Sequence, residues 1–95
     1  MYVEIKKSVY KDIAKVPNNI KILVYENIED LENAESLSGI SNARNMEGTE
    51  ENYYRLKLRN YRMLIHYEKN TKTITVEALT HRKDAYKKEN LHWRK

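Results

Sequence analysis

The N-terminal third of the chain changes from a strand-like to a helix-like spacing of apolar residues. Apolar and polar positions alternate in Tyr2–Ile5, which predicts a short strand. Apolar residues then recur every three or four positions, as on one face of a helix, at Val9, Ile13, Val16, Ile20, Leu23, Val24, Ile28 and Leu31. Pro17 divides this series, because proline lacks the amide hydrogen that a helix interior needs. We therefore expect a helical hairpin with one apolar side, capped at its two starts by Ser8 and by Asn18 or Asn19.

Three segments of the second half have the two-residue period of strands. They are Tyr53–Arg59, Tyr61–Glu68 and Thr73–Thr80. Asn60 offers a tight turn after the first segment, and a short polar tetrapeptide offers another before the third. Because connections this short force antiparallel pairing, the three strands are predicted to form a meander. The preceding stretch, residues 33–52, has little apolar pattern and is expected to be a long loop.

Alternation assigns each side chain of this meander to one of two faces. The helices are expected to cover the face that carries Leu56, Leu58, Met63, Ile65, Ile74, Val76 and Ala78. The opposite face receives Arg55, Lys57, Arg59, Arg62, His66 and His81. Leu64 and Leu79 also fall on that opposite face, which predicts that it is partly covered. The predicted fold is α+β: a small antiparallel sheet with an N-terminal helical hairpin on one face and a short C-terminal helix, in a single domain over residues 1–95.

Composition indicates the cellular compartment of the protein and limits the kinds of site that it can contain. The chain has no cysteine, so disulfides and thiolate metal sites are excluded, which fits a reducing cytoplasm. No apolar run approaches the ~20 residues of a membrane span, and the N-terminus lacks the apolar segment of a secretory signal. The three histidines, His66, His81 and His92, show no ligand spacing with carboxylates. We therefore expect a cytoplasmic protein with no membrane partner, no metal and no cofactor.

Charge is distributed unevenly along the chain. The net charge is +4, but residues 1–52 carry 6 Lys/Arg against 10 Asp/Glu and residues 53–95 carry 12 against 4. No acidic residue occurs from Tyr53 to Tyr67, although a solvated strand face usually mixes both signs. Clustered cations repel one another unless an anion binds, so we favour a phosphate-binding face. The alternative is a solvated surface that serves solubility.

A second set of polar residues follows the last predicted strand. His81, Arg82 and Tyr86 lie close enough in sequence to point back over the cationic face. Histidine exchanges protons near neutral pH, arginine binds phosphate with two parallel donors, and tyrosine stacks on a base or donates its hydroxyl. Each residue alone is more often an ordinary surface or packing residue. Their conjunction favours a functional site.

The order of "YYRLKLRNYRMLIHYEK", an alternating strand and "HRKDAY" resembles toxins of the RelE/ParE superfamily. The resemblance is specifically to the RelE-like messenger-RNA endonucleases of bacterial type II toxin–antitoxin systems, and it covers most of the chain. It implies a small antiparallel sheet with two helices on one face and a catalytic cleft on the other. It also implies that the protein cleaves mRNA, at the ribosome, to inhibit translation, and that a cognate antitoxin protein neutralises it.

The resemblance and the chemistry of RNA cleavage together give roles to individual side chains, and Arg59 is assigned by the chemistry alone. The candidate catalytic residues are Lys57, Arg62, His81 and Tyr86, and the candidate RNA-binding residues are Arg55, Arg59 and Arg82. Cleavage by the RNA's own 2′-hydroxyl needs a base, an acid and cations that stabilise phosphoryl charge, but no metal. Lys57 and Arg62 are expected to supply that charge. His81 is the expected proton carrier, because histidine titrates near neutrality, and Tyr86 is the competing candidate for general base. Thr80 stands where some RelE members have arginine, which leaves the general acid open.

Two other functions are also consistent with the sequence. One is a ParE-like inhibitor of a DNA-processing enzyme, which acts by binding and needs no proton-transfer pair. The other is a noncatalytic RNA- or ribosome-binding module, for which the basic face alone is enough. If the protein is a toxin, we expect the antitoxin to combine acidic residues with a few apolar ones, so that it covers the cationic face together with Leu64 and Leu79 or displaces the last helix. The alternative is that the protein's own final helix covers these two leucines.

Overall fold

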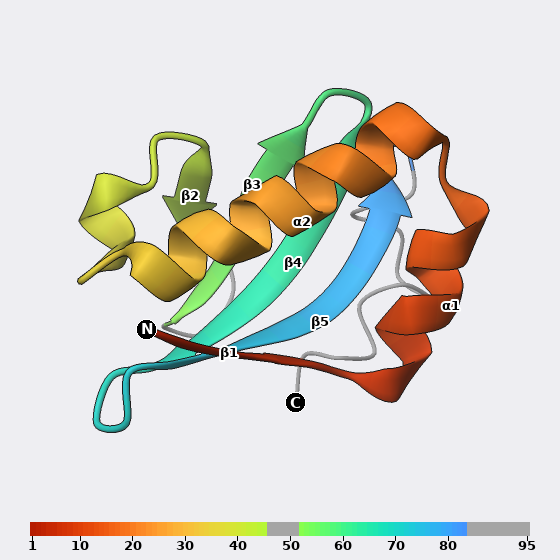
Figure 1. Cartoon of the computed structure of the whole chain (residues 1–95). Helices are drawn as coiled ribbons and strands as arrows, with labels where there is room; N and C mark the ends of the chain where they lie inside the picture. The colour runs from red at the N-terminus through yellow and green to blue at the C-terminus, as the bar shows by residue number, and fades with distance from the viewer. Residues whose placement is uncertain (46–51, 84–95) are drawn as a thin grey trace.

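Two helices lie on one face of a five-stranded sheet in the computed structural model of the chain, which describes residues 1–45 and 52–83 (Figure 1). The elements are β1 (Tyr2–Ile5), α1 (Lys7–Lys15), α2 (Asn18–Asn33), the short 3₁₀ helix η1 (Leu37–Gly39), β2 (Ala43–Asn45), β3 (Tyr53–Leu58), β4 (Tyr61–Glu68) and β5 (Thr73–His81). The two helices predicted in the N-terminal third and all four predicted strands are confirmed. The sequence pattern missed η1 and β2, because each spans only three residues and shows no apolar period of its own.

The sheet is mixed, and the prediction of an antiparallel sheet was wrong. The strand order is β1-β5-β4-β3-β2, and the four strands from β2 to β5 pair antiparallel as expected of a meander. β1, however, pairs parallel with β5, with Val3 opposite Ile74 and Ile5 opposite Val76. Short turns force antiparallel pairing only between strands that they join. The long path from β1 to β5, through both helices and the other strands, leaves the direction of this edge strand free.

The helices begin without the predicted caps. Lys6 is the N-cap of α1 and Pro17 is the N-cap of α2, and neither makes a side-chain capping bond. Ser8 and Asn18 lie inside their helices. The carbonyl of Pro17 accepts the first amide hydrogens of the second helix, from Ile20 at 2.9 Å and Lys21 at 3.0 Å. Pro17 therefore starts α2 as well as ending α1, because a cap residue needs its carbonyl and not its amide hydrogen.

The core fills the space between the helices and the sheet. It contains Val9, Ile13, Val16, Ile20, Val24, Ile28, Leu31, Leu37, Ile40, Leu56, Leu58, Met63, Ile65, Ile74, Val76 and Leu79. Every predicted inward residue of the sheet is in this cluster except Ala78, which lies on the other face with Tyr53 and Leu64. Leu79, predicted for the sheet face away from the helices, is in the core. The two residues have therefore exchanged faces relative to the prediction.

A β-bulge in β5 explains the exchange. Leu64 of β4 pairs with Ala78, but the next residue, Ile65, pairs with Val76, so Glu77 has no partner of its own in the ladder. One extra residue in a strand shifts the alternation of every residue after it by one position. Leu79 thereby turns toward the helices and Ala78 turns away.

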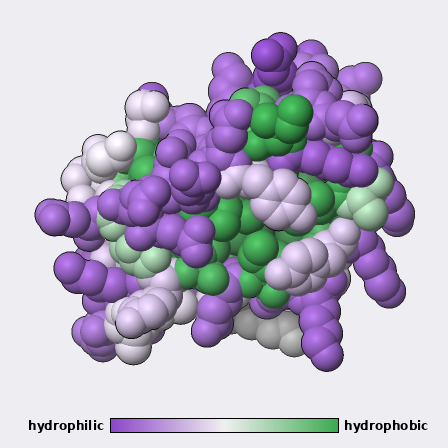
Figure 2. All heavy atoms as spheres, viewed as in Figure 1, coloured by the Kyte–Doolittle hydropathy of each residue, from purple (hydrophilic) through white to green (hydrophobic). Residues whose placement is uncertain are grey.

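The solvent-exposed side of the helices carries both hydrophilic and hydrophobic residues. Figure 2 shows this side, where hydrophilic residues surround a band of hydrophobic ones. Tyr10 of α1 and Ile22 and Tyr25 of α2 are more than half exposed. No helix in residues 1–45 or 52–83 is long and apolar enough to cross a membrane. The predicted C-terminal helix falls outside the described residues.

Candidate functional site

The sheet face away from the helices, called here the outer face, brings the predicted cations into neighbouring rows. Lys57 of β3 pairs with Arg62 of β4, which pairs in turn with Thr80 of β5. In the next row, Arg44 of β2 pairs with Arg55 of β3. Residues paired across neighbouring strands point to the same side of a sheet, and the strands lie about 4.8 Å apart. The fold therefore places four cationic side chains on one small area.

These cations line a hollow that we call the cationic pocket. Its volume is about 480 Å³, and the described residues that line it are Ser41, Asn42, Arg44, Arg55, Lys57 and Arg62. The volume lies within the range of small-molecule binding pockets. None of these six residues is acidic, so the pocket is suited to an anion. Three of the predicted site residues, Arg55, Lys57 and Arg62, are brought together here.

Arg62 lies among these cations, and two hydrogen bonds hold its side chain in place. Its guanidinium donates hydrogen bonds to the carbonyl oxygens of Arg59, at 2.8 Å, and Tyr61, at 2.9 Å. Burial lowers the pKa of the Arg62 guanidinium, and the positive charges of Arg55 and Arg82 lower it further. An arginine remains protonated despite such a shift, because its ordinary pKa is far above neutrality. The lowered pKa therefore reflects burial first and repulsion among cations second, and a bound anion would relieve the repulsion.

Arg44 is a pocket residue that the sequence pattern missed. Its guanidinium donates to the carbonyl oxygens of Ser41 and Ala43, both at 3.0 Å. Arg44 and Arg62 are thus anchored in the same way, each on carbonyl groups of its own loop or turn. An anchored cation loses less side-chain entropy when it binds a phosphate. Nothing in the local sequence signals this role, because Arg44 joins the sheet only through the three-residue strand β2.

His81 is not in the cationic pocket. It pairs with Tyr61, whereas the neighbouring Thr80 pairs with Arg62, so His81 and Arg62 point to opposite sides of the sheet. The His81 ring packs edge-on against the Tyr61 ring, with 5.3 Å between the ring centres. Its Nδ1 accepts the backbone N–H of Lys83 at 3.2 Å. The bulge at Glu77 explains the orientation of His81, because every side chain of β5 that follows the bulge points to the opposite face from the one that simple alternation predicts.

Arg59 and Arg82 are not among the residues that line the cationic pocket. Arg59 is exposed in the turn between β3 and β4 and does not line the pocket. Arg82 is also exposed, and its backbone N–H donates to the carbonyl of Asn60 at 2.6 Å. Its charge is nonetheless close enough to lower the pKa of Arg62. Tyr86 lies outside the described residues.

A second apolar cluster lies beside the cations on the outer face. It consists of Tyr53, Leu64 and Ala78, all of them buried, and the ring of Tyr53 lies 4.8 Å from that of His66. Leu64 is fully buried and Leu79 is only 4% exposed. The expectation that these two leucines present apolar area to a partner is therefore wrong for this structure.

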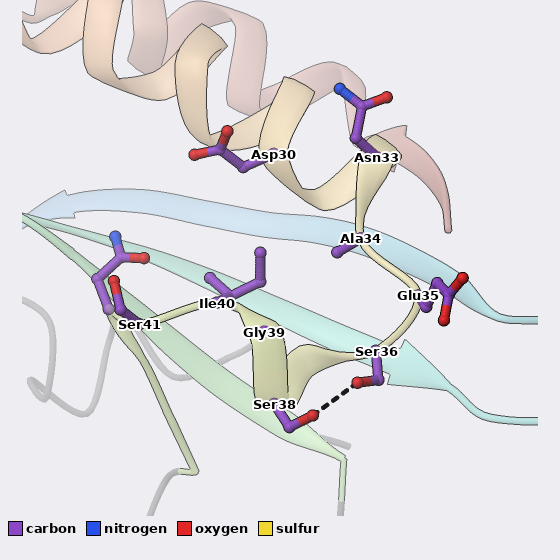
Figure 3. A pocket seen from close by; sticks show the side chains of 10 residues that line it. Asp30, Asn33, Ala34, Glu35, Ser36, Ser38, Gly39, Ile40 and Ser41 are labelled. Carbon is purple, nitrogen blue, oxygen red and sulfur yellow. Dashed lines mark hydrogen bonds between the residues drawn. The ribbon is translucent and has the colours of Figure 1, made fainter.

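A larger hollow lies next to the cationic pocket but has a different character (Figure 3). Its volume is about 580 Å³, and it is lined by Asp30 and Asn33 near the end of α2 and by every residue from Ala34 to Asn42 except Leu37. Ser41 and Asn42 line both hollows and so form the wall between them. The larger hollow carries acidic groups and no lysine or arginine among these residues, so it is not suited to a phosphate. Within the described residues, no three His, Asp or Glu side chains are placed to hold a metal ion.

Comparison with known proteins assigns the chain to a family. No protein-family model matches it. Toxin RelE3 of Methanocaldococcus jannaschii is 34% identical over 87 residues, which span 90% of this chain and 96% of that toxin. The RelB–RelE antitoxin–toxin complex from Methanococcus jannaschii aligns with a TM-score of 0.74 at 30% identity, over 87% of this chain and 94% of that one. The archaeal RelE–RelB complex from Pyrococcus horikoshii OT3 aligns with a TM-score of 0.72 at 26% identity, over 85% of this chain and 93% of that one. With a relative this similar along nearly its whole length, the chain belongs to the RelE family of toxins from toxin–antitoxin systems.

Proposed function

We propose that the chain is an endoribonuclease that cleaves mRNA at the ribosome, in the cytoplasm, and thereby inhibits translation. The observation that carries this proposal is the cationic pocket, in which four cations meet and none of the described residues that line it is acidic. Such a site attracts the RNA backbone and stabilises the additional charge that builds on a phosphoryl group during cleavage. Membership of the RelE family supports the same conclusion.

Each pocket residue has a role that follows from its position in the sheet. Lys57 and Arg62 are paired across β3 and β4, so their charges can act on one phosphoryl group in the transition state. Arg55 and Arg44, in the next row, position the adjoining backbone. Arg59 and Arg82 lie outside the pocket and extend the field that attracts RNA.

Proton transfer is proposed for Tyr86 and His81. Tyr86 is the candidate general base that the family resemblance supports, with a hydroxyl polarised by cations. His81 remains the competing proton carrier, but it would have to act from the end of β5, because its ring packs against Tyr61 on the other side of the sheet. A bound metal is not needed for cleavage by the 2′-hydroxyl, and the cations of the pocket would repel one.

We also propose that a cognate RelB-like antitoxin neutralises this chain. The relatives from Methanococcus jannaschii and Pyrococcus horikoshii are complexes of RelE with RelB. The cationic pocket favours an acidic segment of that partner by charge complementarity. Since Leu64 and Leu79 are buried, charge rather than apolar burial at these two leucines would direct the partner to the outer face.

The proposal is tested with ribosomes that translate a message in the presence of a chelator. We expect fragments with a 5′-hydroxyl on one side of the cut and a 2′,3′-cyclic phosphate or 3′-phosphate on the other. Lys57→Ala and Arg62→Ala should each reduce the cleavage rate by roughly 10²-fold, because each removes charge that acts most strongly in the transition state. Lys69→Ala, in the exposed turn between β4 and β5, is the matched control and should cleave normally.

Two results would contradict this mechanism. Fragments with 5′-phosphates, or loss of cleavage on chelation, would show a metal-dependent reaction. Unchanged turnover in both Lys57→Ala and Arg62→Ala would favour a ParE-like inhibitor or a noncatalytic RNA-binding module. Loss of turnover in His81→Ala or Tyr86→Phe would identify the proton carrier.

A further inference from the structure

A chain of side-chain amides connects α2 to the cationic pocket. Asn27 is the one buried polar residue in the part of the chain that the structure describes, and its Nδ2 donates to the carbonyl of Leu23 at 2.8 Å. Asn42, in the loop before β2, donates its Nδ2 to Asn27 Oδ1 at 2.8 Å and to the carbonyl of Lys57 at 3.2 Å. The N–H of Lys57 donates in return to the carbonyl of Asn42 at 3.3 Å. Asn42 is therefore held by α2 on one side and by the backbone of Lys57 on the other.

The direction of every side-chain hydrogen bond between Leu23, Asn27, Asn42 and Lys57 is fixed. Both ends, at Leu23 and Lys57, are backbone carbonyl oxygens, which only accept. Asn27 must therefore direct its NH₂ group to Leu23 and its oxygen to Asn42. If the Asn42 amide were flipped, its oxygen would face two other acceptors. The NH₂ group of Asn42 is thus committed, and its Oδ1 is the acceptor that remains.

That oxygen differs from the other groups of the pocket. Arg44, Arg55, Lys57 and Arg62 only donate hydrogen bonds, since lysine and arginine have no acceptor. The hydroxyl of Ser41 rotates and serves as donor or acceptor. Asn42 alone, among the described residues that line the pocket, has a side-chain acceptor in an amide whose NH₂ group is already held by two hydrogen bonds. A ligand that places an anion on the cations and a donor beside it would satisfy both.

We propose that Asn42, oriented by Asn27, accepts a hydrogen bond from the ribose 2′-hydroxyl next to the bound phosphate and so makes the pocket prefer RNA to DNA. Every RNA phosphate has a 2′-hydroxyl on its 5′ neighbour, whereas a base donor is present in some nucleotides only. The 2′-hydroxyl is the group by which a protein distinguishes RNA from DNA at a single position. This inference rests on the proposed function, because it takes the pocket to bind an RNA phosphate.

The test uses small ligands that cannot be cleaved. Adenosine 3′-phosphate and 2′-deoxyadenosine 3′-phosphate differ only in the 2′-hydroxyl, and purine riboside 3′-phosphate lacks only the amino group of the base. Their dissociation constants are measured by NMR titration of the whole chain. The native protein should bind the ribonucleotide roughly fivefold more tightly than the deoxynucleotide, the factor contributed by one hydrogen bond of ordinary net strength. Removal of the base amino group should have little effect.

Variants then assign the preference to the amide chain. Asn42→Ala should bind both nucleotides equally, and Asn27→Ala should lose most of the preference without itself contacting the ligand. Asn45→Ala, an exposed asparagine on β2 outside the pocket, is the matched control and should keep the preference. The ratio of the two affinities is the informative quantity, because partial unfolding of a variant lowers both affinities together.

The outcomes separate this inference from the proposed function. Equal binding of both nucleotides by the native protein, or a preference that survives in Asn42→Ala, would overturn the role of Asn42 and leave the RNA-cleaving function standing. A preference that depends on the base amino group would overturn the assignment to the 2′-hydroxyl. If neither nucleotide binds, the phosphate-binding role of the pocket fails together with the inference.

Discussion

At the scale of single residues, the turn between β3 and β4 shows how one side chain serves both fold and site. Arg59 has a φ of 58°, in the left-handed region that costs a residue other than glycine roughly 1–2 kcal/mol. Its carbonyl accepts a hydrogen bond from the Arg62 guanidinium at 2.8 Å. Arg62 therefore helps to hold a strained turn and, at the same time, places its charge in the cationic pocket.

Relief of this strain gives a prediction for Arg59. Arg59→Gly should raise the free energy of unfolding by about 0.5–1 kcal/mol, which is the strain relieved less the entropy that glycine adds to the unfolded chain. RNA affinity should fall in the same variant, because a cation is lost. Arg59→Ala is the control, since it removes the cation but keeps the strain. Equal urea midpoints for the two variants would contradict the assignment of strain to Arg59.

At the scale of elements, the bulge in β5 is associated with an ion pair to the edge strand. Glu77 is the extra residue of the bulge, and its carboxylate pairs with the ammonium group of Lys6, just after β1. The Glu77 side chain is only 9% exposed, whereas Lys6 is 46% exposed. A nearly buried carboxylate is costly unless a cation or a donor compensates it. The pair therefore contributes to the docking of β1 on β5 at the point where the ladder is irregular.

Removal of one partner of this pair should destabilise the protein. Lys6→Met leaves the Glu77 carboxylate uncompensated, and we expect a loss of about 1–2 kcal/mol in the free energy of unfolding, less than for a fully buried pair because Lys6 is partly solvated. Adding Glu77→Gln to Lys6→Met should recover part of the loss. Lys7→Met, at an exposed neighbouring position, is the control for urea unfolding. A double variant that is less stable than Lys6→Met alone would contradict the role of the pair.

At the scale of the whole molecule, acidic side chains gather on α2, on the side of the sheet away from the cationic pocket. The outer face carries the cationic pocket, while α2 carries Glu26, Glu29, Asp30 and Glu32. Such a separation orients an incoming polyanion toward the pocket before contact. Association with RNA should therefore depend strongly on ionic strength and on the cations of one side only.

This separation predicts different effects for cations on the two sides. Arg44→Ala should weaken single-stranded RNA binding and reduce the slope of log K against log salt by about 0.7, the contribution of one neutralised phosphate. Lys11→Ala, on α1 at the helix side, should change neither the affinity nor the slope. Fluorescence anisotropy with a labelled RNA at several salt concentrations measures both quantities. If Lys11→Ala had the larger effect, RNA would bind on the helix side instead.

The sequence by itself determined the elements whose pattern is local. Apolar spacing predicted both helices and the three strands of the meander, because a helix or a strand orients its own side chains. The same two-residue period placed Arg55, Lys57 and Arg62 on one face, and the structure brings all three into the cationic pocket. The absence of acidic residues from Tyr53 to Tyr67 already indicated an anion site.

Only the tertiary structure decided what depends on neighbouring strands. The parallel pairing of β1 follows from where the long crossover ends, and Arg44 and Asn42 join the pocket only because β2 pairs with β3. The bulge at Glu77 moves Leu79 into the core and turns His81 away from Arg62. An alternating pattern continues in a sequence without interruption, but the insertion of one unpaired residue in a ladder depends on the partner strand, and every side chain after it then changes face.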